Sequence, residues 1–228
     1  MVLLRYNAIA MAREGTTVGR PSEERIRNLL APFLSANQLL PIQLDQVSTY
    51  LDLLLRWNFK INLTGVRDPE EIVTRHFGES FFAARRLLAD PALAASAIDV
   101  GSGAGFPGLP LKIWSPQVRL TLAEANNKKV AFLREVVRAL GLSDVTVLAV
   151  RAENLGAQAD LVTLRAVEQF EKILPIARGM VKDSGRLALL IGESQLEAAK
   201  VICPDLRWNN AARIPYSRNR VLAVGALP

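Results

Sequence analysis

Glycines occupy three alternate positions directly after a short apolar run near the middle of the chain. Residues 97–100 are apolar apart from Asp99, and Gly101, Gly103 and Gly105 follow them. This order predicts a buried strand that turns sharply into a loop, with a helix to follow. Glycine adopts positive φ angles and lets a ligand approach the main chain closely. The segment therefore indicates an α/β fold with a ligand-binding loop after one of its strands.

The spacing of the glycines separates this loop from other nucleotide-binding loops. The dinucleotide fingerprint G-x-G-x-x-G needs glycine where Phe106 stands, and a P-loop needs Gly-Lys-Ser/Thr. The segment from Gly101 through Ser102 to Gly105 instead resembles the cofactor loop of Rossmann-like S-adenosylmethionine (AdoMet) methyltransferases. A tight turn in another kind of α/β enzyme is the alternative.

The composition is that of a globular protein with a preference for polyanions. The 228 residues suffice for one large domain with an appendage, and half of them are apolar. The net charge of +6 favours a polyanionic partner, most simply nucleic acid. Cys203 is the only cysteine and His76 the only histidine, which excludes an internal disulfide and a multi-histidine or cysteine-based metal site. We expect no metal.

The sequence also bears on location. Sparse cysteine fits a reducing compartment. The longest apolar runs fall far short of the ~20 residues that span a bilayer. Residues 1–12 have a mildly apolar start without a clear cleavage site, so we interpret them as part of a loose extension and not as a signal peptide. We expect a cytoplasmic monomer without a membrane partner.

We divide the chain into a flexible N-terminal extension (1–20), a helical region (21–90) and an AdoMet-binding domain (91–228). In the helical region Ser22 can cap a first helix and Pro41 can open a second. The run from Asp68 to Glu71 predicts the start of a third helix, which continues past His76.

From residue 97 onward, apolar strand candidates alternate with helical stretches. The strand candidates are 97–100, 119–124, 145–149, 160–164, 186–191, 207–214 and 220–225, and the helical stretches are 106–114, 126–140 and 168–181. Such alternation predicts βαβ units and a mostly parallel sheet. No helix-length spacer separates the last two strands, so we expect them to form an antiparallel pair at one edge.

In open α/β sheets the ligand binds beyond the carboxyl ends of the strands. Glu124 ends the second strand, about 20 residues after the glycines, where a carboxylate can accept hydrogen bonds from both ribose hydroxyls. Ala152 and Glu153 follow the third strand, where we expect the adenine ring. Arg165 ends the fourth strand and can hold a carboxylate or an RNA phosphate. The alternatives are a surface acid for Glu124, a capping or solvated residue for Glu153 and a structural ion pair for Arg165.

Several cations and aromatic residues are candidates for contact with RNA. Lys128 can reach the site, whereas we expect Lys129 to face solvent. Arg218 and Arg220 belong to a tail that contains arginines and no acid, which favours phosphate binding. The stretch 56–60 alternates cations with aromatic residues and can stack bases, although we expect at least one of its aromatic residues to pack the helices onto the sheet.

The combined pattern resembles the bacterial ribosomal RNA small subunit methyltransferase G family, also called glucose-inhibited division protein B. The resemblance covers roughly residues 41–192 and the run 220–224. It rests on Trp57-Asn58, Asn62-Leu63-Thr64, Arg67-Asp68, Arg75-His76, Ser80, the segment 99–108, Pro110, Lys128, Phe132-Leu133, Arg151, Glu153 and Arg165-Ala166. One departure is Ile191, where the family often has lysine.

The resemblance implies AdoMet-dependent methylation of a guanine N7 in 16S ribosomal RNA, free or within the small subunit. Matched positions imply cofactor contacts at Gly101, Phe106, Glu124, Ala152, Glu153 and Arg165, and we add Ser102, Gly103 and Gly105 from the glycine loop. Guanine N7 carries a lone pair and no proton, so the reaction needs positioning and not a general base. We therefore assign no catalytic residue, and His76 is the one candidate base. A methyltransferase acting on another RNA or on a small molecule, and a non-catalytic RNA-binding or assembly protein, are the alternatives.

Overall fold

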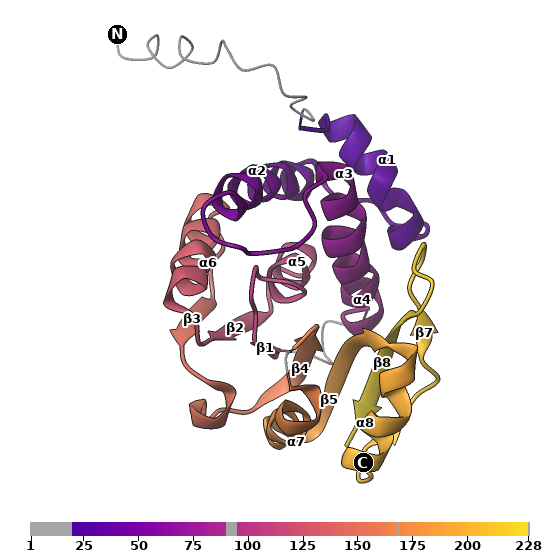
Figure 1. Cartoon of the computed structure of the whole chain (residues 1–228). Helices are drawn as coiled ribbons and strands as arrows, with labels where there is room; N and C mark the ends of the chain where they lie inside the picture. The colour runs from indigo at the N-terminus through magenta and orange to yellow at the C-terminus, as the bar shows by residue number, and fades with distance from the viewer. Residues whose placement is uncertain (1–19, 90–94, 168, 228) are drawn as a thin grey trace, which may run out of the picture.

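A mixed β-sheet lies between two layers of helices in the computed structural model, which describes residues 20–89, 95–167 and 169–227 (Figure 1). The strand order is β3-β2-β1-β4-β5-β8-β6, and β7 pairs with β8. The strands are β1 (Ser96–Val100), β2 (Arg119–Glu124), β3 (Val145–Ala149), β4 (Ala159–Arg165), β5 (Val181–Gly192), β6 (Arg207–Trp208), β7 (Ala212–Arg213) and β8 (Arg220–Ala226). Strands β1 to β5 are parallel, so their carboxyl ends meet at one edge. The order reverses between β1 and β4, the point where ligands bind in such sheets.

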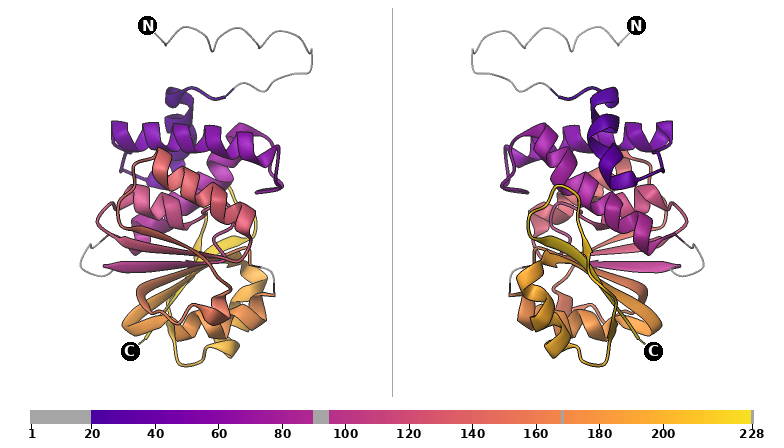
Figure 2. Two further views of the ribbon diagram at one scale, coloured as in Figure 1. Left: turned by 90° about the vertical axis from the view of Figure 1, so that its left-hand side faces the viewer. Right: turned by 90° about the vertical axis from the view of Figure 1, so that its right-hand side faces the viewer.

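The helices cover both faces of the sheet. They are α1 (Glu23–Leu34), α2 (Pro41–Asn58), α3 (Pro69–Ile72), η1 (Val73–Gly78), α4 (Glu79–Leu87), α5 (Gly108–Trp114), α6 (Asn127–Ala139), η3 (Ala152–Asn154), α7 (Phe170–Gly179), η4 (Glu193–Gln195) and α8 (Leu196–Ile202). Figure 2 shows α7 and α8 on one face and the helices from α1 to α6 on the other. None of the helices in the described ranges is long and apolar enough to cross a bilayer.

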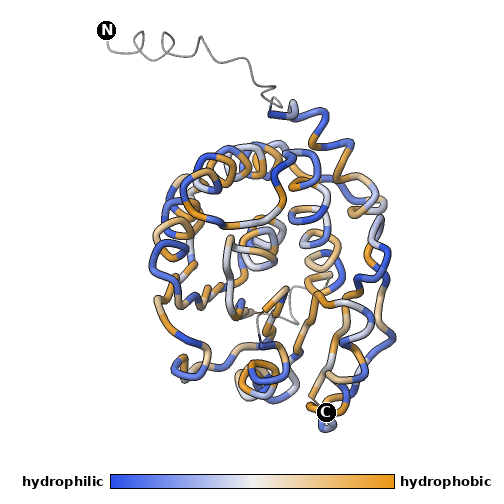
Figure 3. Tube along the Cα trace, viewed as in Figure 1, coloured by the Kyte–Doolittle hydropathy of each residue, from blue (hydrophilic) through white to orange (hydrophobic). Residues whose placement is uncertain are grey.

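Successive residues of the central strands pack into two different cores. Ala97 and Leu161 belong to the core shared with the N-terminal helices, whereas Ile98 and Val162 belong to the core beneath α7 and α8. Because side chains alternate across a strand, a strand that is buried on both faces is apolar over most of its length. The orange, hydrophobic stretches of the central strands in Figure 3 follow this pattern.

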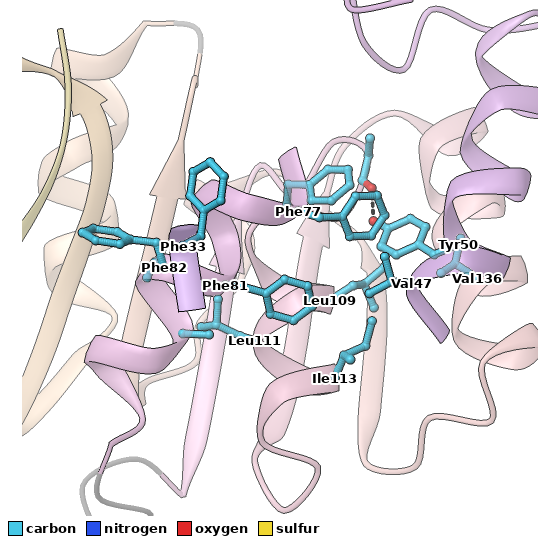
Figure 4. Packing of buried hydrophobic residues seen from close by; sticks show 14 of the residues in the cluster. Phe33, Val47, Tyr50, Phe77, Phe81, Phe82, Leu109, Leu111, Ile113 and Val136 are labelled. Atoms are coloured by element: carbon cyan, nitrogen blue, oxygen red, sulfur yellow. Dashed lines mark hydrogen bonds between the residues drawn. The ribbon is translucent and has the colours of Figure 1, made fainter. Parts of the chain in front are cut away.

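The N-terminal helices pack directly on the glycine loop. Tyr50 of α2 stacks on Phe106 with an interplanar angle of 4°, and its hydroxyl donates a hydrogen bond to the backbone carbonyl of Ala104. Phe77 meets the rings of both Tyr50 and Phe106 edge-on. Figure 4 shows Tyr50, Phe77 and Phe81 within the surrounding apolar cluster. The helical region thus shares a core with the sheet, and the boundary drawn at residue 90 stays a prediction.

The start signals of the N-terminal helices are confirmed. Ser22 Oγ accepts a hydrogen bond from Arg25 N at 3.2 Å, and Asp68 Oδ1 accepts one from Glu71 N at 2.7 Å. The third helix is not regular, however, because the π-helical turn η1 lies between α3 and α4. Such turns widen a helix by one residue and frequently occur at functional sites. His76 lies in this turn.

The C-terminal edge differs in detail from the predicted pair of strands. The run 207–214 is not one strand, because the loop at Asn209 and Asn210 separates β6 from β7; asparagine favours turns. Both short strands pair antiparallel with β8, and β8 pairs antiparallel with β5. Strand β5 also begins earlier than predicted, at Val181, ahead of an irregularity in its pairing with β4. The extension predicted for residues 1–20 lies outside the described residues apart from Arg20.

Candidate functional site

Positive φ angles and hydrogen bonds to the end of β2 shape the main chain of the glycine loop. Gly101, Gly103 and Gly105 all have positive φ angles, of 66°, 58° and 89°. The amides of Gly101 and Ser102 both donate to the carbonyl of Ala123, at 2.9 and 3.1 Å, which ties the loop to the end of β2. A side chain at Gly103 would meet no atom of the described residues closer than 3.8 Å, so this glycine borders open space.

Gly105 has a different role from the other two glycines. A Cβ atom at this position would collide with Tyr50 Oη and Leu109 Cδ1, so Gly105 faces the core. It is not among the described residues that line the cavities at the strand ends. Close packing against α2 and α5 requires glycine at this position, and the cofactor contact assigned to Gly105 stays a prediction.

Glu124 lies beneath the loop with both carboxylate oxygens directed by main-chain amides. Oε2 accepts from Gly103 N and Oε1 from Asn126 N, each at 2.8 Å. The side chain is buried, yet Glu124 lines a cavity of about 480 Å³ that we call the β2–β3 cavity. Gly101, Ala152 and Glu153 line the same cavity. Four predicted cofactor residues are thus brought together at the ends of β1, β2 and β3.

A second cavity, of about 650 Å³, adjoins the first, and we call it the central cavity. Gly101, Lys129 and Ala166 line both cavities, which makes them parts of one cleft. The lining of the central cavity includes Ser102, Gly103, Phe106 and Arg165 from the sheet side, and residues 63–68, Glu71, Arg75 and His76 from the helical region. The N-terminal helices therefore supply one wall of the site.

A cluster of charges closes the end of the central cavity. Glu79 Oε2 accepts from Arg165 Nη2 at 3.1 Å and pairs with Arg220 Nη2 at 2.9 Å. Arg165 Nη2 also donates to the backbone carbonyl of Arg75, at 2.6 Å. Burial lowers the pKa of Arg165 to about 10, and Glu79 opposes this shift, so the guanidinium stays charged at pH 7. Arg165 therefore forms the structural ion pair that was the alternative interpretation, and its side chain also lines the central cavity.

His76 is held as a neutral ring between an arginine and a hydroxyl. Its Nδ1 lies 3.0 Å from Arg165 Nη2, which can only donate, so Nδ1 accepts and the ring proton sits on Nε2. Nε2 then donates to Thr64 Oγ1 at 2.7 Å. Burial, together with the positive charges of Arg165, Arg75 and Arg220, lowers the pKa of His76 to about 3. Both ring nitrogens are engaged, so His76 is suited to orienting Thr64 and not to removing a proton.

We predict that His76 stays uncharged between about pH 5 and 8. Because the folded value lies below the value of about 6.5 expected for the unfolded chain, the stability from the neutral ring is present above pH ~6.5 and is lost as the pH falls toward ~3. His76 is the only histidine, so its ring gives a single set of NMR signals. These should not shift across this range, while the urea-unfolded chain should titrate near 6.5. An inflection near pH 6.5 in the folded protein would contradict this assignment.

Asp99 supports the glycine loop from inside the core. Its carboxylate accepts from Thr163 Oγ1 at 2.7 Å and from Gly108 N at 3.2 Å, which joins β1 to β4 and to the start of α5. Burial raises the pKa of Asp99 to about 6, against the opposing effect of these hydrogen bonds. Asp99 is absent from the described lining of the cleft, so its role is to hold the loop in place.

The structure differs from the expectation at Lys129 and agrees with it at the aromatic residues, of which one packs, whereas the RNA contacts assigned to Lys128 and Arg220 stay predictions. Lys129 lines both cavities, whereas Lys128 is exposed and lines neither. Adjacent residues point about 100° apart on a helix, and Asn126 Oδ1 caps the start of this helix by accepting from Lys128 N and Lys129 N. Arg220 is not a free surface arginine, because it pairs with Glu79. Of the aromatic residues in 56–60, Trp57 packs on α6, where it donates to Glu135 Oε2, and Phe59 is 92% exposed.

Thr64, Glu79 and Lys129 belong to the site although the sequence alone did not indicate them. Thr64 and Glu79 come from the helical region, and only the tertiary fold brings them to the strand ends. The cofactor roles assigned to Gly101, Ser102, Gly103, Phe106, Glu124, Ala152, Glu153 and Arg165 stay predictions, although all eight line the cleft. Among the described residues, no group of three or more metal-binding side chains lies together.

Comparison with known proteins shows one matching family model and several relatives of the same name. The family model described as rRNA small subunit methyltransferase G matches residues 43–206. A curated protein of that name from Roseiflexus sp. (strain RS-1) is 46% identical over 146 residues, which cover 60% of this chain and 61% of that protein. The namesake from Xylella fastidiosa (strain 9a5c) is 41% identical over 170 residues, which cover 72% of this chain and 78% of that protein. The match thus spans less than two thirds of the Roseiflexus protein's length.

Solved structures show the fold. Magnesium protoporphyrin IX methyltransferase from Synechocystis PCC 6803, solved with bound SAM, has a TM-score of 0.62 at 15% identity and covers 85% of this chain and all of its own. The ribosomal protein L11 methylase from Lactobacillus delbrueckii subsp. bulgaricus has a TM-score of 0.57 at 13% identity and covers 72% of this chain and 81% of its own. The predicted Rossmann-like methyltransferase fold, preceded by a helical region, is confirmed.

Proposed function

Because this chain belongs to the rRNA small subunit methyltransferase G family, we propose that it transfers a methyl group from AdoMet to N7 of a guanine in 16S ribosomal RNA. The observation that carries the proposal is the continuity of the cleft. A buried carboxylate and open glycines suited to a nucleoside lie next to a cavity lined by cations from both the helices and the sheet. The RNA, free or in the small subunit, is the proposed partner, and a cytoplasmic monomer remains part of the proposal.

The residues of the cleft fit AdoMet. Glu124 Oε1 and Oε2 each accept one main-chain hydrogen bond and keep further lone pairs for the ribose hydroxyls. Gly103 leaves space beside them, and Ala152 and Glu153 are available to the adenine. Lys129, which lines both cavities, can hold the carboxylate of the methionine part. AdoMet supplies a methyl group bound to a positively charged sulfur, which makes the methyl carbon a strong electrophile. The protein therefore has to position and orient the two reactants.

The residues around the central cavity favour an acceptor that needs no base. The lone pair of guanine N7 forms the new N–C bond, the electrons of the S–C bond pass to sulfur, and no proton has to leave. Neutral His76, with both nitrogens engaged, agrees with such a reaction. Methylation at carbon 5 of a pyrimidine usually needs a nucleophilic cysteine, and Cys203, the only one in the sequence, is buried beneath α7 and α8.

An exposed aromatic ring, that of Phe59, lies shortly before the loop that lines the central cavity. Phe59 precedes residues 63–68 and is flanked by exposed Arg56 and Lys60. Stacking on a base contributes ~1–3 kcal/mol, so Phe59→Ala should weaken binding of 16S RNA by about 5- to 150-fold without changing AdoMet affinity. Phe59→Trp, which keeps a stacking surface, should bind like the wild type in filter-binding titrations. Equal loss in both variants would exclude stacking.

Arg218, which is exposed, stays a proposed phosphate contact.

Two measurements separate this function from its alternatives. Calorimetric titration with AdoMet tests the cofactor site, and an absence of binding would favour a non-catalytic RNA-binding protein. Incubation with tritiated AdoMet and small ribosomal subunits, followed by separation of RNA from small molecules, tests the acceptor class. We expect the label in the RNA. Label that stays with small metabolites would favour a small-molecule methyltransferase.

A further inference from the structure

A third, smaller hollow lies beside the central cavity at the ends of β4 and β5, and we call it the β4–β5 slot. Its volume is about 200 Å³, below the ~300–1,000 Å³ of sites for drug-sized ligands. Leu164, Val167, Phe170 and Ile191 give it apolar walls, and Gln195 and Arg220 give it polar groups. Among the described residues the lining is mainly apolar, and the volume suits one aromatic base.

The slot is continuous with the proposed cofactor cleft. Ala166 and Arg220 line both the slot and the central cavity. Ala166 has a positive φ of 49°, and Gln169 has one of 55°, so the chain after β4 turns sharply at both ends of the segment that carries Val167. Left-handed backbone in residues other than glycine is strained and concentrates at ligand sites. The strained backbone at Ala166, which lines both hollows, therefore marks the boundary between them as a candidate ligand site.

Gln195 provides a hydrogen-bond donor with a fixed orientation. Its Oε1 accepts from Gly192 N at 3.1 Å, which sets the direction of the amide. Within the part of the chain that the structure describes, Nε2 has no hydrogen-bond partner. Because Gln195 lines the slot, this NH₂ group is available to an acceptor atom inside it. Ile191 is 5% exposed and supplies apolar wall where a lysine would bring a charge.

We propose that the β4–β5 slot receives the acceptor guanine after it leaves its stack in the RNA, an inference that rests on the proposed function. Enzymes that act on a base commonly extrude it into a pocket where it stacks on apolar side chains. Here Phe170 and Ile191 contact the ring, and Gln195 Nε2 donates to the carbonyl oxygen O6. Adenine carries an amino group at that position, so the same donor disfavours it. N7, adjacent to O6, then faces the central cavity.

Gln195→Glu removes the donor, keeps the side-chain oxygen that serves Gly192 N and adds one negative charge, which the control below also adds. Glutamate keeps an oxygen that accepts from Gly192 N, but it replaces the NH₂ group with a second acceptor. We expect kcat/KM for methyl transfer to small-subunit RNA to fall by about tenfold or more, with unchanged AdoMet affinity in calorimetry. Gln158→Glu is the matched control, because this glutamine lies at the opposite end of the strands and contacts Gly179 O. It should behave like the wild type.

A second variant and a binding measurement keep the inference testable if Gln195→Glu perturbs the fold. Phe170→Ala should lower kcat/KM, whereas Phe170→Leu should retain more activity. Saturation-transfer NMR with guanosine and adenosine, in the presence of S-adenosylhomocysteine, should show contact with guanosine that Gln195→Glu weakens. If the wild type labels RNA and all slot variants match it, the slot is not the base site and the proposed function stands. If the wild type labels no RNA, both proposals fail.

Discussion

Replacing Glu79 with glutamine should lower the free energy of unfolding by about 3–5 kcal/mol. Glu79 is 3% exposed, and its Oε2 serves both Arg165 and Arg220. Glutamine leaves two guanidinium groups close together without a counter-charge, and Arg165 is buried at 5% side-chain exposure. Removing one partner of a buried ion pair is much more costly than removing an exposed one. Urea unfolding followed by circular dichroism measures the loss.

Two further variants define what the Glu79 result means. Glu71→Gln removes the exposed partner of Arg75 on the preceding turn and should cost less than ~1 kcal/mol. The double variant Glu79→Gln/Arg220→Gln should recover part of the loss, because it also removes one of the two unpaired charges. If Glu79→Gln costs no more than Glu71→Gln, the cluster is hydrated and does not organise the end of the central cavity.

Replacing Glu124 with alanine should weaken AdoMet binding by about 10- to 150-fold. The carboxylate is placed by Gly103 N and Asn126 N, and a hydrogen bond to a charged group contributes ~1.5–3 kcal/mol. Alanine removes the acceptor for the ribose and also leaves the Gly103 amide without its partner. Calorimetric titration with AdoMet and with S-adenosylhomocysteine should show the same loss, since both share the ribose.

The matched control for Glu124 is Glu197→Ala, an exposed acid on α8 that pairs with Lys200. It should leave the affinity unchanged. Thermal unfolding without cofactor should be affected only modestly by Glu124→Ala, whereas the stabilisation by added AdoMet should largely disappear. Unchanged affinity in Glu124→Ala would mean that the ribose binds elsewhere and that the β2–β3 cavity has another role.

The features that sequence reasoning predicted are those determined by local chemistry. Apolar runs at strand spacing, caps at Ser22 and Asp68 and the glycines after β1 depend on neighbouring residues, so the sheet and most helices could be located. Glu124 was found because the end of β2 lies next to the end of β1 in any such sheet. These signals predicted the order of the elements and the residues at the strand ends that line the cleft.

The features that sequence reasoning missed depend on rotation or on distant pairing. Whether Lys128 or Lys129 faces the cleft is set by the rotation of α6, which one residue changes by about 100°. Arg220 looked like a free tail arginine because its partner, Glu79, lies far away in the sequence. The π-helical turn that carries His76 has no sequence signal as clear as a proline or a cap. The role of Gly105 required knowledge that Tyr50 packs on it.

The position of the methyl group in the product tests the central proposal most directly. Small-subunit RNA labelled by the enzyme with tritiated AdoMet can be digested to nucleosides and separated, and a guanine methylated at N7 is also cleaved selectively after reduction and aniline treatment. We predict that the label co-migrates with 7-methylguanosine and that cleavage maps to a single guanine. Label on a pyrimidine, on an exocyclic amine or on ribose would contradict the proposal.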